Sequence, residues 1–209
     1  IVNPDTYTWQ YRNTSGSDGS KMILYTTTDM SQLGNVTGAI TLDIKGGNIA
    51  QSVFGGGNES PSRNNTTVII NEGTVVGTNV FGGGNIADVD GSTQVSIKSG
   101  NINKNVYGAG AGNLLLATAG QVRKNVTVDI TGGTIGGNVY GGGAIANSNA
   151  DASTNSSAYT TKVNLAGGLI KGDAFGGGEG TMDYDPNSSE QKANAAALVY
   201  GDVTVTFNG

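Results

Sequence analysis

The sequence predicts an all-β fold, a right-handed parallel β-helix (β-solenoid) of about five coils. Two observations support this prediction. An aromatic residue is followed five times by a glycine-rich triplet, and each triplet follows an alternating apolar strand and a glycine turn at a nearly fixed distance. Repeats at this spacing are typical of stacked repeat architectures. The five motifs are Phe54-Gly55-Gly56-Gly57, Phe81-Gly82-Gly83-Gly84, Tyr107-Gly108-Ala109-Gly110, Tyr140-Gly141-Gly142-Gly143 and Phe175-Gly176-Gly177-Gly178.

Each unit opens with a short strand in which apolar and polar residues alternate, as expected where one face is buried. The strands lie at 41–44, 67–70, 94–97, 127–130 and 162–165, with a sixth copy at 204–207. The other positions form a mostly polar outward column, to which Ile69 is the exception. The expected inward column is Leu42, Ile44, Val68, Ile70, Val95, Ile97, Val128, Ile130, Val163, Leu165, Val205 and Phe207.

A glycine turn follows each strand, at a corner where φ is positive or where stacked backbones approach closely. One further aliphatic residue then points inward. The unit ends in an aliphatic–aromatic pair, whose rings we expect to stack in a ladder inside the coil. The expected inward aliphatic residues are Ile49, Val75, Ile102, Ile135 and either Leu169 or Ile170.

The spacing within the units favours a solenoid over other all-β folds. From the last aliphatic residue of a strand to the aromatic residue the step is 10 or 11 residues. From the aromatic residue to the next strand's aliphatic residue it varies between 16 and 32. Stacked faces must stay in register while loops at one corner can grow. A right-handed crossover is the expected hand. An antiparallel β-sandwich is the main alternative, but it gives no reason for the fixed step.

The chain divides into two regions. Residues 1–38 do not fit the repeat and contain two short strands, at 7–12 and 22–26. We expect them to form an N-terminal cap over the open edge of the first coil. Residues 39–209 hold the β-solenoid repeats and stop inside the sixth unit. We therefore expect neighbouring repeats of the same, longer chain to be partners of this segment.

Composition narrows the classes of function. The net charge is −5, with 11 lysines and arginines against 16 aspartates and glutamates. A sequence-independent nucleic-acid binder needs a basic stripe, so we expect no nucleic-acid partner. No apolar run approaches the roughly 20 residues that span a bilayer, so we expect no direct membrane insertion. Cysteine and histidine are absent, which excludes thiol nucleophiles, cysteine-ligated metals and histidine acid–base chemistry.

One corner of each coil is variable in length and is the candidate contact surface. The segments that absorb the insertions are 111–125, 144–160 and 179–202. Neighbouring coils lie about 4.8 Å apart, so these loops would form a common patch or groove wall. The candidate contact residues in them are Arg123, Asn149, Asp151 and Tyr184. The alternative is that a solenoid accepts insertions wherever its core is undisturbed.

Oxygen ligands are densest in segment 183–190, where carboxylates two positions apart suit a hard cation such as calcium. A calcium site here would use Asp183, Asp185, Asn187 and Glu190. The segment lacks the central glycine and final glutamate of an EF-hand, so we favour a solvated acidic loop over a metal site. No other cofactor is expected. The segment Asp88-Val89-Asp90-Gly91 is interpreted as a turn.

The sequence does not predict an enzyme. Glycoside hydrolysis needs two carboxylates at acid–base distance. Asp43 and Asp129 share a strand column but lie three coils apart, about 14 Å by strand spacing, which exceeds the separation even of an inverting pair. No strand column carries an aspartate ladder with a neighbouring arginine. We therefore assign no catalytic residue.

The repeat unit resembles repeats in large cell-surface proteins of gut anaerobes. The motif Asn-Val-Tyr/Phe-Gly-Gly-Gly, clearest at 79–84 and 138–143, is similar to that of adhesin-type β-helices in the general style of autotransporter passengers. The resemblance covers about residues 38–209. It implies an extracellular, surface-displayed segment with an adhesion or stalk role, and glycans or host or microbial surface proteins as partners. A carbohydrate-active or carbohydrate-binding β-helix is the alternative, and no catalytic residue is carried over.

Overall fold

The computed structural model describes residues 8–12, 22–26, 34–114, 116, 118–181 and 196–208. The chain divides into two compact units after Asn35, three residues before the boundary expected from the repeat. The first unit contains an antiparallel hairpin of β1 (Thr8–Arg12) and β2 (Met22–Thr26). That this hairpin caps the first coil stays a prediction.

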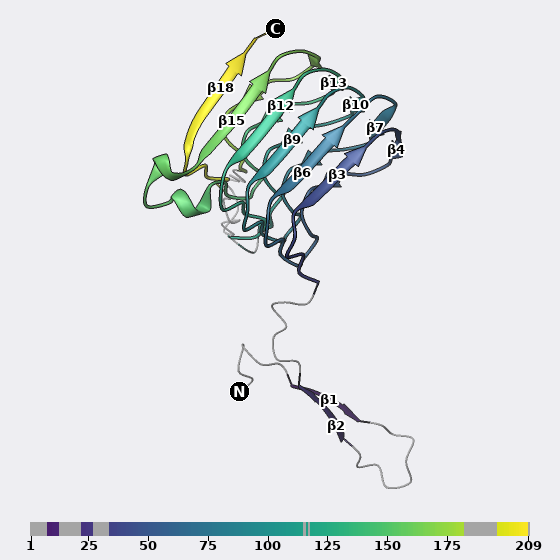
Figure 1. The fold of residues 1–209 in the computed structure, drawn as a ribbon, viewed down its shortest axis with the longest axis vertical. Coiled ribbons are helices and arrows are strands. Elements are labelled where there is room, and N and C mark those ends of the chain that lie inside the picture. The colour runs from purple at the N-terminus through teal and green to yellow at the C-terminus, as the bar shows by residue number, and fades with distance from the viewer. Residues whose placement is uncertain are drawn as a thin grey trace, which may run out of the picture. The chain divides into compact units, whose positions relative to one another are not determined.

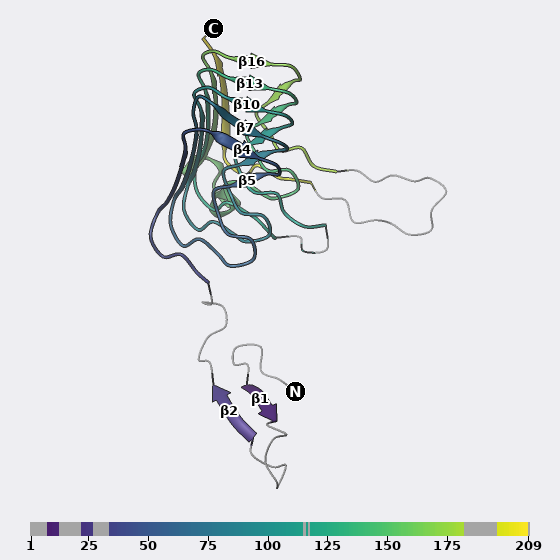
Figure 2. The same ribbon diagram turned by 90° about the vertical axis from the view of Figure 1, so that its right-hand side faces the viewer.

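The second unit is a parallel β-helix with three sheets, each built from one strand per coil (Figures 1 and 2). The broad sheet contains β3 (Ile40–Ile44), β6 (Thr66–Ile70), β9 (Thr93–Ile97), β12 (Val126–Ile130), β15 (Thr160–Leu165) and β18 (Asp202–Phe207). The middle sheet contains β4 (Gly47–Ile49), β7 (Thr74–Val76), β10 (Asn101–Ile102), β13 (Thr134–Ile135) and β16 (Leu169–Ile170). The aromatic sheet contains β5 (Val53–Phe54), β8 (Val80–Phe81), β11 (Val106–Tyr107), β14 (Val139–Tyr140) and β17 (Ala174–Phe175).

Like residues of successive coils lie in register. Ile70 pairs with Ile44 on one side and with Ile97 on the other, and Ile130 pairs with Ile97 and Leu165. All strand pairs of this unit are parallel among the described residues, which rules out the antiparallel sandwich. The inward aliphatic residues of the three sheets form one continuous core, so the predicted fold is confirmed.

One residue of the inward column differs from the sequence prediction, and one alternative left open by the sequence is decided. Val76, not Val75, is the fully buried residue of β7, and it pairs with Ile49 and Ile102. In β16 the inward residue is Ile170. The error at β7 arose because the second unit carries one extra residue. The structure places that residue in the turn before β7, which shifts the strand by one position and so reverses its faces.

The last strand of the broad sheet is an open edge. Val205 and Phe207 continue the predicted column, pairing with Val163 and Leu165. They are nevertheless 48% and 74% exposed, because among the described residues β18 pairs with a strand on one side only.

The aromatic rings stack in a ladder as predicted, but the ladder does not lie inside the coil with the aliphatic residues, as expected; it forms a second core beside them. The five rings stack with centroids 4.7–5.0 Å apart, and Phe81, Tyr107 and Tyr140 are buried. Successive residues of a strand point to opposite faces, so the valine of each pair enters the aliphatic core while the ring leaves it. Ala111 and Ala144, which follow the glycine triplets, pack against the rings.

An asparagine precedes the valine–aromatic pair in three coils and joins each coil to the next. Asn79 Oδ1 accepts a hydrogen bond of 3.0 Å from the backbone N–H of Asn105, and Asn105 Oδ1 accepts one of 2.8 Å from that of Asn138. The amide nitrogen of Asn105 donates to the hydroxyl of Tyr107, which itself donates to Glu179 at 2.5 Å. Burial raises the pKa of Tyr107, and the hydrogen bond to Glu179 raises it further. The recurring asparagine therefore has a structural role.

Candidate functional site

The variable loops meet the broad sheet at a fourth side of the coil, which we call the bridge corner. Here the coils pair only through single parallel bridges, along the column Val36, Ser62, Val89, Val122, Ser148 and Val199. Two short 3-10 helices, η2 (Ala150–Ala152) and η3 (Ser156–Ala158), lie in the insertion between the fourth and fifth coils. Backbone hydrogen bonds join successive coils at these bridges, as from Asp90 N–H to the Ser62 carbonyl and from Arg123 N–H to the Val89 carbonyl, and side chains add further contacts.

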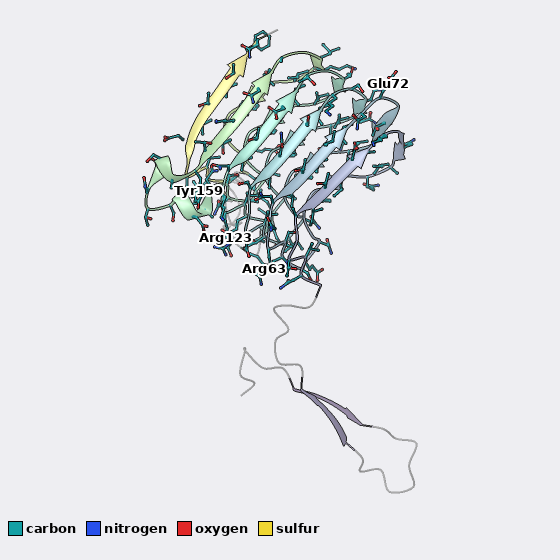
Figure 3. The ribbon with its side chains drawn as sticks, in the orientation of Figure 1. Arg63, Glu72, Arg123 and Tyr159 are labelled. Carbon is teal, nitrogen blue, oxygen red and sulfur yellow. The ribbon has the colours of Figure 1, made fainter. Side chains whose placement is uncertain are left out.

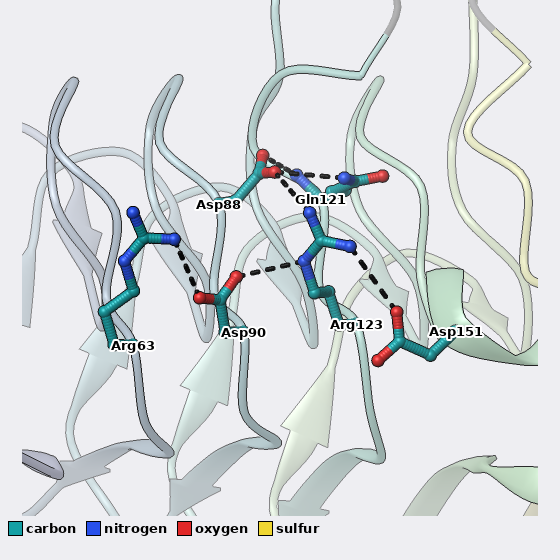
Figure 4. Close-up of polar contacts among 6 residues, drawn as sticks. All are labelled: Arg63, Asp88, Asp90, Gln121, Arg123 and Asp151. Carbon is teal, nitrogen blue, oxygen red and sulfur yellow. Dashed lines mark hydrogen bonds and ion pairs between the residues drawn. The ribbon is translucent and has the colours of Figure 1, made fainter. Parts of the chain in front are cut away.

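Charged residues of alternating sign follow one another along the bridge corner (Figure 4). We call Arg63, Asp90, Arg123 and Asp151 the charged row. Arg63 Nη1 lies 2.9 Å from Asp90 Oδ2, and Arg123 Nε lies 3.0 Å from Asp90 Oδ1. On its other side, Arg123 Nη1 lies 3.5 Å from Asp151 Oδ1. Figure 3 shows Arg63 and Arg123 at the same end of the broad-sheet strands. The row therefore links four consecutive coils.

Asp88 lies beside the charged row and is half-buried. Its carboxylate accepts hydrogen bonds from the backbone N–H of Gln121 at 3.2 Å and from the Gln121 amide nitrogen at 3.0 Å. Arg123 Nη2 lies 3.8 Å from it. Burial raises the pKa of Asp88, although the hydrogen bonds from Gln121 and the charge of Arg123 oppose this rise.

The structure places the candidate contact residues in different environments. Arg123 and Asp151 come together in the charged row, with side chains 39% and 38% exposed. Asn149, by contrast, is fully buried. Its amide donates to the carbonyl of Lys124 at 2.7 Å, and its oxygen accepts from Thr161 Oγ1 at 2.7 Å. Asn149 therefore holds the insertion onto the broad sheet and is unavailable to a partner.

The backbone of Asn149 explains the choice of residue. Its φ of 54° lies in the left-handed region, which asparagine adopts more readily than most residues. Tyr184 and the calcium candidates Asp183, Asp185, Asn187 and Glu190 lie outside the described residues. Within the described part of the chain, no group of three or more acidic side chains is arranged to hold a metal ion.

Sequence reasoning missed Arg63, and it missed Asp88 and Asp90 because the segment 88–91 looked like an ordinary turn. The spacing of the charged residues in the sequence could have predicted the charged row. Arg63, Asp90 and Arg123 each stand three positions before the first residue of β6, β9 and β12. Aligned by coil, they give the alternation of charge directly.

The arrangement is suited to joining coils and to presenting a surface of mixed charge. Each arginine of the row contacts a carboxylate, and part-exposed ion pairs contribute only about 0–1 kcal/mol each.

On the broad sheet, Asp43 and Asp129 are separated by Ile69 and Ser96, three coils apart as expected. Asp129 accepts hydrogen bonds from Gln94 and Asn164.

Within the residues that the structure describes, no helix combines the length and the apolarity needed to cross a membrane. Protein-family models give no match to this chain, and neither curated proteins nor solved structures show a significant similarity to it.

Proposed function

We propose that this chain is a non-enzymatic β-solenoid segment of a bacterial cell-surface protein, which spaces or displays loops outside the cell. One observation carries the proposal: the residues that recur in every coil face other coils, whereas the insertions gather at the bridge corner. The aliphatic core, the aromatic ladder and the asparagine hydrogen bonds all join one coil to the next. A repeat built in this way supports a rigid spacer more directly than it supports a reaction site.

The physical basis of a spacer is the continuous pairing along the axis. The five stacked strands of the middle and aromatic sheets span about 19 Å at the usual strand spacing, and the six of the broad sheet span about 24 Å. Each coil is held by backbone ladders on three sides, and by single backbone bridges together with the charged row on the fourth. Stability of such an array comes from the contacts between neighbouring coils, so length can be added coil by coil without a new core.

The loops at the bridge corner are the proposed contact surface, and glycans or surface proteins are the proposed partners. Residues 153–158 are exposed and lie next to the charged row in sequence. Arg123 and Asp151 present opposite charges there, which suits a polar partner better than an apolar one. A carbohydrate-active β-helix is the competing proposal.

A glycan array combined with a depolymerisation assay on acidic polysaccharides tests the proposal. We expect no chain cleavage. Binding that is lost when residues 153–158 are replaced by a short glycine–serine linker would assign display to the corner loops. If neither binding nor cleavage is observed, the chain would act as a spacer without a display role. Single-molecule pulling can test the spacer role by measuring the force needed to unfold the coils. Cleavage of any polysaccharide would overturn the proposal.

A further inference from the structure

The outer face of the middle sheet carries a shallow groove, and this sheet follows the carboxyl ends of the broad-sheet strands, whereas the loops lead into their amino ends. It has a volume of about 540 Å³ and crosses β7, β10, β13 and β16. Its lining includes Val75, Asn101, Asn103, Thr134, Leu169 and Lys171. The groove is open to solvent, so a ligand would lie along the sheet face rather than be enclosed. Four adjacent strands also give it a length of about 14 Å.

The polar groups of this groove are unengaged, unlike those of the charged row. Among the described residues, none makes a side-chain hydrogen bond or ion pair with the side chains of Asn101, Asn103, Thr134 or Lys171. They offer two amides, a hydroxyl and an ammonium group, so donors outnumber acceptors. Val75 is half-buried and Leu169 is 54% exposed, which adds an apolar strip beside them.

The charge around the groove is opposite to that of the whole chain. Lys98 and Lys104 flank β10 and are exposed, and Lys171 follows β16. None of the three forms an ion pair with a described carboxylate. Glu72 and Asp173 are the acidic residues in the neighbouring turns. In a chain of net charge −5, the one charged side chain among the described residues that lines the groove is Lys171, and a lysine there favours an anionic ligand.

The position of the groove decides which anionic ligand fits. A peptide strand adds to the free edge of a sheet, through backbone hydrogen bonds. This groove lies on a sheet face, where the backbone groups already pair with neighbouring coils, so recognition must use side chains. Amides and a hydroxyl that both donate and accept suit the ring hydroxyls of a sugar, and an ammonium group suits its carboxylate.

We propose that the outer face of the middle sheet binds an acidic, uronate-containing oligosaccharide. Lys171 pairs with a carboxylate, Asn101, Asn103 and Thr134 bind ring hydroxyls, and Val75 and Leu169 contact the apolar face of the sugar. The site is separate from the loops at the bridge corner, so it goes beyond the display role proposed above and does not need those loops.

Isothermal titration of the full chain with trigalacturonate tests the proposal, with its methyl ester as the uncharged control. We expect binding of the acid, weakening with salt, and a clear preference for it over the ester. Lys171→Ala should weaken binding about tenfold, as should Asn101→Ala, since each removes a hydrogen-bonding group from the ligand. Lys162→Ala is the matched control, because Lys162 is an exposed lysine of the same coil on the broad sheet.

The outcomes separate this site from the corner loops. Loss of affinity in the Lys171 and Asn101 variants, with normal binding by the 153–158 replacement, supports the groove whether or not the loops bind anything. Equal weakening by Lys162→Ala would mean attraction to surface charge in general and would overturn the proposal. No binding of trigalacturonate, or binding that depends on residues 153–158, would overturn it as well.

Discussion

The first glycine of the first four triplets lies where the backbones of neighbouring coils approach closely, and Gly82→Ala tests this contact. A Cβ atom at Gly82 would meet the carbonyl oxygen of Gly108 in the next coil, well below the 3.0 Å that real Cβ contacts respect. The φ angle of Gly82 is not in the left-handed region, so the need for glycine here is one of space alone. The same close approach recurs at Gly55, Gly108 and Gly141.

The loss of stability expected for Gly82→Ala can be estimated from the displacement that the added methyl group requires. The obstructing atom belongs to the backbone, so the two coils must separate or shift. Two hydrogen bonds lie at this contact, from Gly82 N–H to the Tyr107 carbonyl at 3.0 Å and from Gly83 N–H to the Ala109 carbonyl at 3.1 Å. Overpacking costs about 1–3 kcal/mol, and each weakened hydrogen bond about 1 kcal/mol. We expect a loss of about 3–5 kcal/mol, or roughly 6–20 °C in melting temperature.

Gly177→Ala is the matched control for this experiment. Gly177 is the middle residue of the last triplet, and a Cβ atom there meets nothing within 4 Å. The third triplet already carries Ala109 at the middle position, so alanine is compatible with that place in the motif. Urea unfolding followed by far-ultraviolet circular dichroism measures both variants. If Gly82→Ala lost less than about 1 kcal/mol, or no more than Gly177→Ala, the close stacking inferred from the structure would be refuted.

Three other predictions concern the aromatic ladder, Asp88 and the open edge. Phe81→Ala should lose about 3–5 kcal/mol in the same urea assay, because its ring is buried between two others, whereas Phe175→Ala, exposed at the end of the ladder, should lose about 1 kcal/mol. Burial raises the pKa of Asp88 in the folded chain. The folded state therefore binds that proton more tightly, and wild type should gain stability relative to Asp88→Asn as the pH falls from 7 through the folded pKa toward about 4. Urea midpoints over that pH range would contradict this if the difference stayed constant or moved toward the variant. Val205→Lys on β18 should reduce any self-association seen in analytical ultracentrifugation, since a charge on an exposed edge opposes strand pairing between chains. Unchanged association would show that the chains do not associate through this edge.

The fold could be predicted because its signal repeats. A buried residue such as Ile97 recurs at the same place in every unit. Where the orientation of one residue is ambiguous, the equivalent residues of the other units therefore indicate it. Val75 shows the limit of this averaging. With two valines in succession, alternation alone cannot tell which faces inward, and the extra residue in the preceding turn moved the strand by one position.

The candidate site was harder to predict because it lies where the repeat is interrupted. Asn149 stands in an insertion of irregular length, so nothing in its surroundings distinguishes an exposed amide from a buried one. Only the structure shows that its amide hydrogen-bonds to Lys124 and Thr161. The aromatic ladder could be predicted in part. The stacking of its rings followed from the spacing of the motifs, but their separation from the aliphatic core depends on which face of a two-residue strand each ring occupies.

The alternation of charge at the bridge corner also affects how the chain folds. Coils with nearly identical aliphatic rungs can stack in the wrong order, since the core alone cannot tell the third coil from the fourth. A chain that skipped one coil would bring Arg63 next to Arg123, or Asp90 next to Asp151, and like charges in contact oppose each other. The alternation of signs along the row therefore disfavours the skipping of a single coil, a misassembly that the hydrophobic residues alone would accept.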